Sequence, residues 1–141
     1  MSRFQRKDGI FFVKMEKLLG FPPKQIHYYE EAFTLGTHSL TSSHSTVNYE
    51  RLEFLGDAVV ELTTSEFLFK KFPELAEGEL TKLRASIVCE KTLVKYALQL
   101  NLDKCIYLGR GEEKMGGRSR AALLADIFES FTGALYLETN L

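Results

Sequence analysis

The segment from Ala121 to Phe131 constrains the fold more than any other part of the sequence, because nearly every residue in it is small or apolar. A helix that is apolar almost all round has to be buried. Asp126 and Glu129 interrupt this pattern, and their spacing places them on one helix face, with Gly133 on the same stripe. Buried carboxylates are costly unless they pair with a cation or bind a metal. Taken alone, this helix leaves an ion pair and a metal site about equally open.

A second helical pattern, from Tyr49 to Phe72 and closed by Pro73, also carries acids. Its carboxylates share one narrow stripe: Glu50, Glu53, Asp57 and Glu61. Four apolar residues are expected on the opposite, buried side: Leu52, Leu55, Val59 and Leu62. A solvated acidic face would explain such a stripe on a generic amphipathic helix. Two residues argue against it here, because Phe54 lies beside the stripe and Gly56, in mid-helix, indicates close approach of another backbone.

Two acidic pairs on two helices favour a metal over an ion pair. Carboxylates without a neighbouring histidine form an all-oxygen site that suits Mg²⁺ or Mn²⁺ better than Zn²⁺. Residues 48–80 hold eight acids and three bases, whereas residues 104–120 hold five bases and two acids. A metal site beside a basic loop suits a phosphodiester substrate, with a solvated loop as the competing interpretation of the second segment.

The remaining pattern predicts a single all-α domain of 141 residues. Helices are expected between Asp8 and Gly20, over residues 24–33, 49–72, 79–88 and 90–100, and from an N-cap near Ser119, with loops at 36–48 and 108–117. The net charge of −1 provides no overall basic field, and no apolar run is long enough to span a membrane. Cys89 and Cys105 are too few for a disulfide framework and are expected to fill small spaces in the core. We therefore expect a soluble, cytoplasmic protein.

These motifs, taken together and in order, resemble the ribonuclease III endonuclease domain. The similarity lies in ERLEFLGDAV at residues 50–59, EGELTKLRA at 77–85, GRGEEK and GGR between 109 and 118, and LADIFE at 124–129. It runs from about residue 49 to residue 138. The resemblance implies a metal-dependent endoribonuclease that hydrolyses the phosphodiester bonds of double-stranded RNA. Its products would carry 5′-phosphate and 3′-hydroxyl ends with short 3′ overhangs, and its role would be in rRNA and mRNA processing.

The resemblance also implies roles for individual residues. Four match the metal-binding carboxylates of the family, with Asp57 and Glu129 as the catalytic pair: Glu53, Asp57, Asp126 and Glu129. Glu50 and Glu77 match secondary acids, and Mg²⁺ would be the cofactor, with Mn²⁺ as a substitute. Phe54 matches an aromatic residue that fits a socket in the partner of a homodimer. Three bases in and after the basic loop are candidates for RNA contact: Lys114, Arg118 and Arg120.

The whole chain, residues 1–141, is expected to be one nuclease domain. In the family this domain continues past residue 138 into a further helix and a double-stranded-RNA-binding domain, and neither is expected here. The sequence departs from the family at Leu40, at Tyr49 between Asn48 and Glu50, and at Ala121, but not at the four carboxylates. Two alternatives stay open: a non-catalytic ribonuclease III-like module that binds RNA or the ribosome, and a structural helical dimer with its acids in salt bridges.

Overall fold

A computed structural model describes residues 9–35, 49–108 and 110–140. The predicted cap at Asp8, the loop over residues 36–48, Leu40 and Asn48 lie outside the described residues. The described elements are α2 (Ile10–Leu19), α3 (Ile26–Ala32), α4 (Glu50–Lys71), α5 (Glu77–Ile87), α6 (Glu90–Gln99), the 3₁₀ helix η1 (Leu102–Cys105), α7 (Arg110–Lys114), the 3₁₀ helix η2 (Gly117–Ser119) and α8 (Ala121–Thr139). One isolated bridge, Thr34 with Tyr107, is the sole β pairing within these ranges. The predicted all-α class is confirmed.

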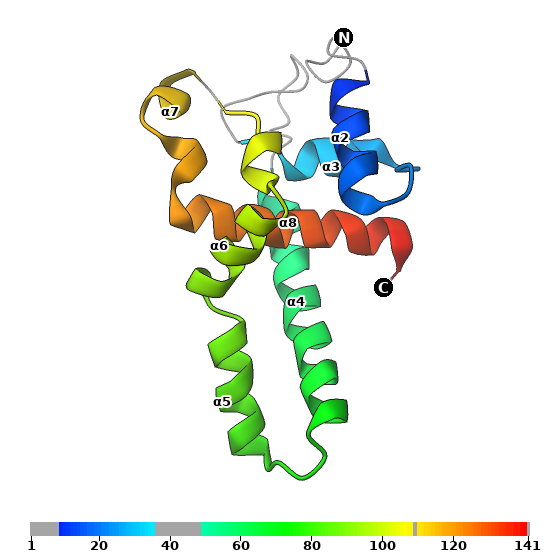
Figure 1. The fold of residues 1–141 in the computed structure, drawn as a ribbon, viewed down its shortest axis with the longest axis vertical. Helices are drawn as coiled ribbons and strands as arrows, with labels where there is room; N and C mark the ends of the chain where they lie inside the picture. Colours follow the sequence, from blue (N-terminus) through cyan, green and yellow to red (C-terminus); the bar gives the residue numbers. More distant parts are fainter. Residues whose placement is uncertain (1–8, 36–48, 109, 141) are drawn as a thin grey trace.

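Helix α8 lies at the centre of the fold, as its apolar sequence predicts. It packs against α3, α4 and α6, and crosses the N-terminal half of α4 (Figure 1). Leu124, Ile127 and Ala134 of α8 are almost completely buried. They join a core to which α2 contributes Phe11 and Met15. The position of α8 therefore follows from the absence of a polar face wide enough to meet water.

The crossing of α4 and α8 depends on two glycines. A Cβ atom at Gly56 would overlap the backbone carbonyl of Glu129, and a Cβ atom at Gly133 would overlap that of Leu52. Only residues without side chains allow the two backbones to touch in this way. The close approach predicted from Gly56 is confirmed.

The second half of α4 and all of α5 project from the core as a helical hairpin (Figure 1). Helix α5 has no buried residue, and Arg84 ties it to α4 by bonds to Glu61 and Ser65, at 3.1 and 3.0 Å. The prediction that Leu62 is buried is wrong. The Leu62 side chain is exposed because α8 covers α4 where the two helices cross, on the side of Leu52 and Gly56.

Four local predictions also need correction. Helix α5 starts at Glu77, two residues early, and Glu79 accepts a hydrogen bond from the Ala76 N–H at 3.3 Å. The basic segment at 108–117 contains the short helix α7, and Ser119 belongs to η2, so Arg120 directly precedes α8. Cys105 is buried in the core as predicted, whereas Cys89 is only half-buried beside Thr92.

Across the described ranges, we find no helix long and apolar enough to cross a bilayer.

Candidate metal centre

Three carboxylates meet where α4 crosses α8. One oxygen each from Glu53, Asp126 and Glu129 lies within 4.8 Å of the others. Glu129 is buried, with 9% of its surface exposed, and the other two residues are half-buried. Glu53 stands about one turn before Gly56 on α4, and Gly56 touches the backbone of Glu129, so the glycine contact brings the acids of the two helices together.

The ionisation of these acids is opposed by their surroundings. Burial raises the pKa of Glu129 to about 8, assisted by a hydrogen bond with Asp57 and by repulsion from Asp57, Glu53 and Asp126. Burial, followed by repulsion from Asp126, Glu50 and Asp57, raises the pKa of Glu53 to about 7. The pKa of Asp126 is raised by burial and then by the nearby Glu90. A cation bound among these oxygens would remove the repulsion.

The competing interpretation, an ion pair with a base from another helix, holds for a different acid. Glu61, on the same stripe of α4, pairs with Arg84 of α5 at 3.1 Å. In the part of the chain that the structure describes, no Lys or Arg forms an ion pair with Glu53, Asp126 or Glu129. Their donor set, oxygen only and without histidine, fits Mg²⁺ or Mn²⁺.

The other predicted acids lie at different distances from this cluster. Asp57 is exposed and shares a hydrogen bond with Glu129, but lies outside the three-residue group. Glu50 is exposed and lies close enough to Glu53 to raise the pKa of Glu53. Glu77 starts α5 at the far tip of the hairpin (Figure 1), where it accepts a hydrogen bond from the Thr81 hydroxyl at 2.9 Å. The structure therefore does not bring Glu77 to the cluster of its own chain.

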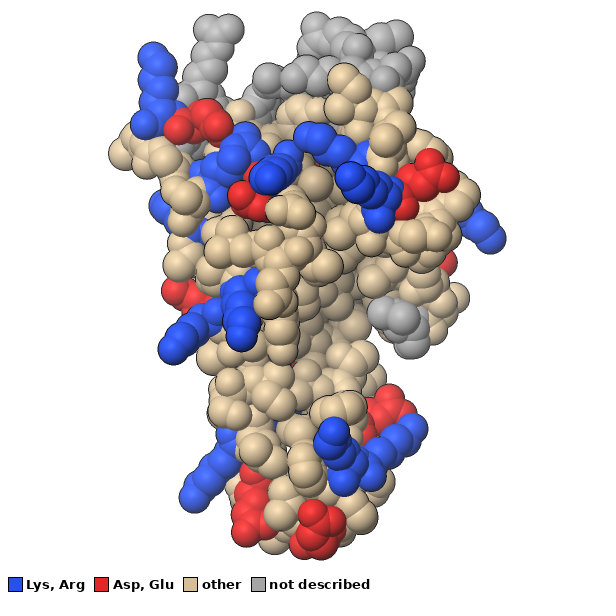
Figure 2. Space-filling model, viewed as in Figure 1, with Lys and Arg blue, Asp and Glu red and all other residues tan. Residues whose placement is uncertain are grey.

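The three predicted RNA contacts differ in how free their side chains are. Lys114 and Arg120 are exposed. Arg118 instead donates through Nε and Nη2 to Glu113, at 3.1 and 2.8 Å, and through Nη1 to the carbonyls of Asp103 and Ile106, at 2.8 and 2.7 Å. It joins the α7–η2 segment to η1, so its main contacts are internal. Figure 2 shows Lys and Arg side chains on the upper, middle and lower parts of one face of the molecule, with acidic side chains among them.

Two further residues, Tyr49 and Glu90, adjoin the cluster but were not predicted from the sequence as site residues. Burial, followed by Asp126, Glu53 and Glu50, raises the pKa of Tyr49 to about 12. Its position directly before the acidic motif is the signal that could have found it. Glu90 begins α6 and acts on Asp126 from another helix, so no spacing in the sequence could have shown it.

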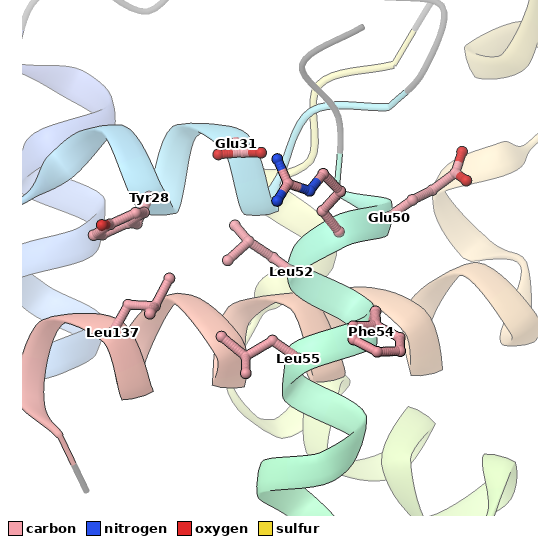
Figure 3. Close-up of a pocket in the computed structure, with 8 residues that line it drawn as sticks. Tyr28, Glu31, Glu50, Leu52, Phe54, Leu55 and Leu137 are labelled. Atoms are coloured by element: carbon pink, nitrogen blue, oxygen red, sulfur yellow. The ribbon is translucent and has the colours of Figure 1, made fainter.

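A separate hollow of about 610 Å³ lies between α3, α4 and α8. It is lined by Tyr28, Glu31, Glu50, Arg51, Leu52, Phe54, Leu55 and Leu137 (Figure 3). Phe54 stands at its edge with 83% of its surface exposed. Its lining combines apolar side chains such as Leu52 and Leu137 with a few charged ones, a composition that is typical of binding sites.

Comparison with known proteins decides the family. A family model described as Ribonuclease-III-like matches residues 31–141. The chain belongs to the ribonuclease III family. A solved nuclease domain of ribonuclease III from Campylobacter jejuni is 41% identical, with a TM-score of 0.81 over 89% of this chain and 85% of that one. That nuclease domain shows structural flexibility in a region involved in dimer formation. The fold predicted from the ribonuclease III resemblance is thereby confirmed.

Two curated relatives and a second solved structure extend the similarity. Ribonuclease 3 of Listeria monocytogenes is 50% identical over 131 residues, which are 91% of this chain and 56% of that protein. Ribonuclease 3 of a Geobacillus species is 53% identical over 140 residues, 99% of this chain and 53% of that protein. Dicer from Pichia stipitis is 31% identical, with a TM-score of 0.60 over 85% of this chain and 51% of that one. The chain thus spans about half the length of the curated relatives it matches.

Proposed function

We propose that residues 1–141 form the nuclease domain of a ribonuclease III that hydrolyses phosphodiester bonds in double-stranded RNA. The observation that carries this proposal is the convergence of Glu53, Asp126 and Glu129, whose oxygens lie within 4.8 Å of one another and whose pKa values are all raised. The family resemblance adds the expected products, which are 5′-phosphate and 3′-hydroxyl ends with short 3′ overhangs. It also suggests rRNA and mRNA as substrates, in the cytoplasm, where two free cysteines stay reduced.

Mg²⁺, or Mn²⁺ in its place, is the cofactor that fits this donor set. A divalent cation held by Glu53, Asp126 and Glu129 would supply the Lewis-acid charge that metal-assisted phosphodiester hydrolysis needs. Such a role explains why three acids lie together with no ion-pair partner among the described residues. Their mutual repulsion, which is a cost in the empty cluster, becomes affinity for a cation.

Residues of the chain would position Glu129, leave room for a phosphate group and contact the RNA. Glu129 is held in place from one side by the backbone contact with Gly56 and from the other by its hydrogen bond with Asp57. Asp57 is exposed, so the cluster opens to solvent on its side, where a phosphate group could approach. Lys114 and Arg120, whose side chains are exposed, would contact the RNA backbone.

We also propose that the active form is a homodimer. Phe54 and the hollow beside it lie on one surface, and a twofold axis would insert the Phe54 of each copy into the hollow of the other. Burying each ring would contribute about 1.5–3 kcal/mol. Two more exposed apolar side chains, Leu62 and Phe69, lie with Phe54 within about 80° of the α4 circumference and would extend the interface.

One experiment tests the nuclease proposal against both alternatives. A long RNA duplex is incubated with the protein at low salt, with and without Mg²⁺, and the product ends are mapped. Cleavage that requires Mg²⁺ and leaves the expected ends supports the proposal. A duplex that is retained in a gel shift but stays intact would indicate a binding module, and neither binding nor cleavage would indicate a structural dimer.

A further inference from the structure

Glu138, near the end of α8, is bonded to the segment that leads into α3. Its Oε2 atom accepts hydrogen bonds from the backbone N–H groups of Lys24 and Gln25, both at 2.8 Å. Its Oε1 atom accepts one from the Tyr29 hydroxyl at 2.9 Å. Gln25, which precedes α3, makes no side-chain capping bond of its own. A carboxylate more than one hundred residues further along the chain therefore accepts the hydrogen bonds of the backbone N–H groups at the start of this helix.

These bonds are hard to replace because one of their donors is completely buried. Tyr29 has no exposed surface, and its ring packs against Phe131 of α8, with the ring centroids 6.0 Å apart. Burial, and then the Glu138 carboxylate, raise the pKa of Tyr29, so its hydroxyl stays a donor. Without Glu138 this hydroxyl would lose its partner inside the protein. The contact thus ties the N-terminal end of α3 to the C-terminal end of α8.

The residues that make this contact are direct neighbours of residues that line the hollow beside Phe54. Tyr29 follows Tyr28, and Glu138 follows Leu137, and both neighbours form its wall (Figure 3). In that view α3 lies above the hollow, α8 lies below it, and α4 stands to its right. A shift of α3 relative to α8 would therefore change the width of the hollow directly.

We propose that Glu138 is a positioning residue for dimer formation, which holds α3 against α8 so that the hollow is preformed for the Phe54 side chain of a second copy. This inference rests on the homodimer proposed above. When α3 is already held in place, dimer formation loses no free energy in ordering it. Loss of Glu138 therefore weakens the dimer as well as the fold.

The experiment compares dimer dissociation constants by sedimentation for the unmutated chain, Glu138→Ala, Tyr29→Phe and Leu93→Val. Leu93 is buried with Val60 and Ala125, in a cluster without residues of α3, so Leu93→Val is a destabilised control. We expect Glu138→Ala to raise the dissociation constant by about tenfold or more, and Leu93→Val to change it by less than about twofold. Tyr29→Phe, which loses one of the three bonds, is expected to fall between them.

A second measurement reads α3 without the dimer. In a monomeric Phe54→Asp background, Glu138→Ala should speed hydrogen exchange at the amides of residues 24–32 but not in α6. If Glu138→Ala does not fold, Glu138→Gln, which keeps one acceptor oxygen, takes its place. A dimer that is unaffected by the loss of Glu138, or equally weakened by Leu93→Val, overturns this inference alone. A monomeric unmutated chain overturns the homodimer, and this inference with it.

Discussion

Gly56 of α4 lies directly against the backbone carbonyl of Glu129 of α8, with no room for a methyl group between them. This contact brings the acidic stripe of one helix to the acids of the other. It also places the Glu129 side chain where burial raises its pKa to about 8. One small residue thereby sets both the crossing of the two longest helices and the geometry of the candidate metal centre.

Gly56→Ala is expected to destabilise the fold. The added methyl group meets backbone, which cannot move aside as a side chain can, so the free energy of unfolding should fall by about 1–3 kcal/mol or more. Gly78→Ala is the matched control, because its methyl group meets nothing within 4 Å and alanine favours the helix by about 1 kcal/mol. Urea denaturation measures both variants. Equal stability of the two would contradict the close crossing.

The stability of the metal-free protein should depend on pH in a specific direction. The pKa values of Glu53 and Glu129 in the folded state, about 7 and about 8, lie above those of carboxyls in the unfolded chain. At pH values between the unfolded and the folded pKa, the folded state therefore binds more protons than the unfolded state. The free energy of unfolding should therefore be greatest near about pH 4–5 and fall as the pH rises to about 8.

Mg²⁺ should reverse this loss, because it binds the ionised acids of the folded state only. The gain in melting temperature at millimolar Mg²⁺ should be larger at pH 8 than at pH 5, and Mn²⁺ should act likewise. Glu129→Gln serves as the control in which the gain is reduced. A melting curve that does not respond to either metal at any pH would favour the structural interpretation of the acids.

Glu129→Gln should abolish cleavage and leave RNA binding largely intact. The substitution keeps the size of the side chain but removes one carboxylate from the cluster, so the cleavage rate should fall by at least about 100-fold. Glu66→Gln is the control, since Glu66 is exposed and pairs with Lys70, at 2.8 Å. Cleavage rates and gel-shift affinities on one duplex separate the two effects. Normal turnover by Glu129→Gln would remove this residue from the mechanism.

Phe54→Asp should convert the dimer to a monomer. A charged side chain cannot enter the apolar hollow of a second copy without losing its hydration. Met115→Asp is a suitable control, because Met115 is equally exposed, at 86%, but lies after α7, away from the hollow. Sedimentation of the two variants measures the difference, and a similar mass for both would refute this interface.

Arg118 and Lys114 should fail in different ways when replaced by alanine. Arg118→Ala loses four hydrogen bonds within the protein, so its melting temperature should fall. Lys114→Ala should keep the melting temperature and weaken duplex binding, with a shallower dependence on salt. The reverse pattern would restore Arg118 as a direct RNA contact.

Much of the site could be predicted because its signals are local. The spacing of Asp126 and Glu129 in an apolar segment indicated a buried acidic face, and Gly56 indicated where another backbone would approach. The residues that sequence analysis missed or misplaced act across helices. Glu90 reaches Asp126 from α6, Glu138 caps the start of α3 from α8, and the expected RNA contact Arg118 is bonded to carbonyls of η1.

The sequence by itself determined where the longer helices lie, that the last helix is buried, and which acids share a stripe, because these properties depend on the period of one helix. Only the tertiary structure decided which side of α4 is covered. Leu62 has the chemistry of a core residue, yet it is exposed because α8 crosses α4 at Gly56 and does not extend along it. Burial depends on where a second helix lies, and that position is set by long-range packing, which the period of a single helix does not contain.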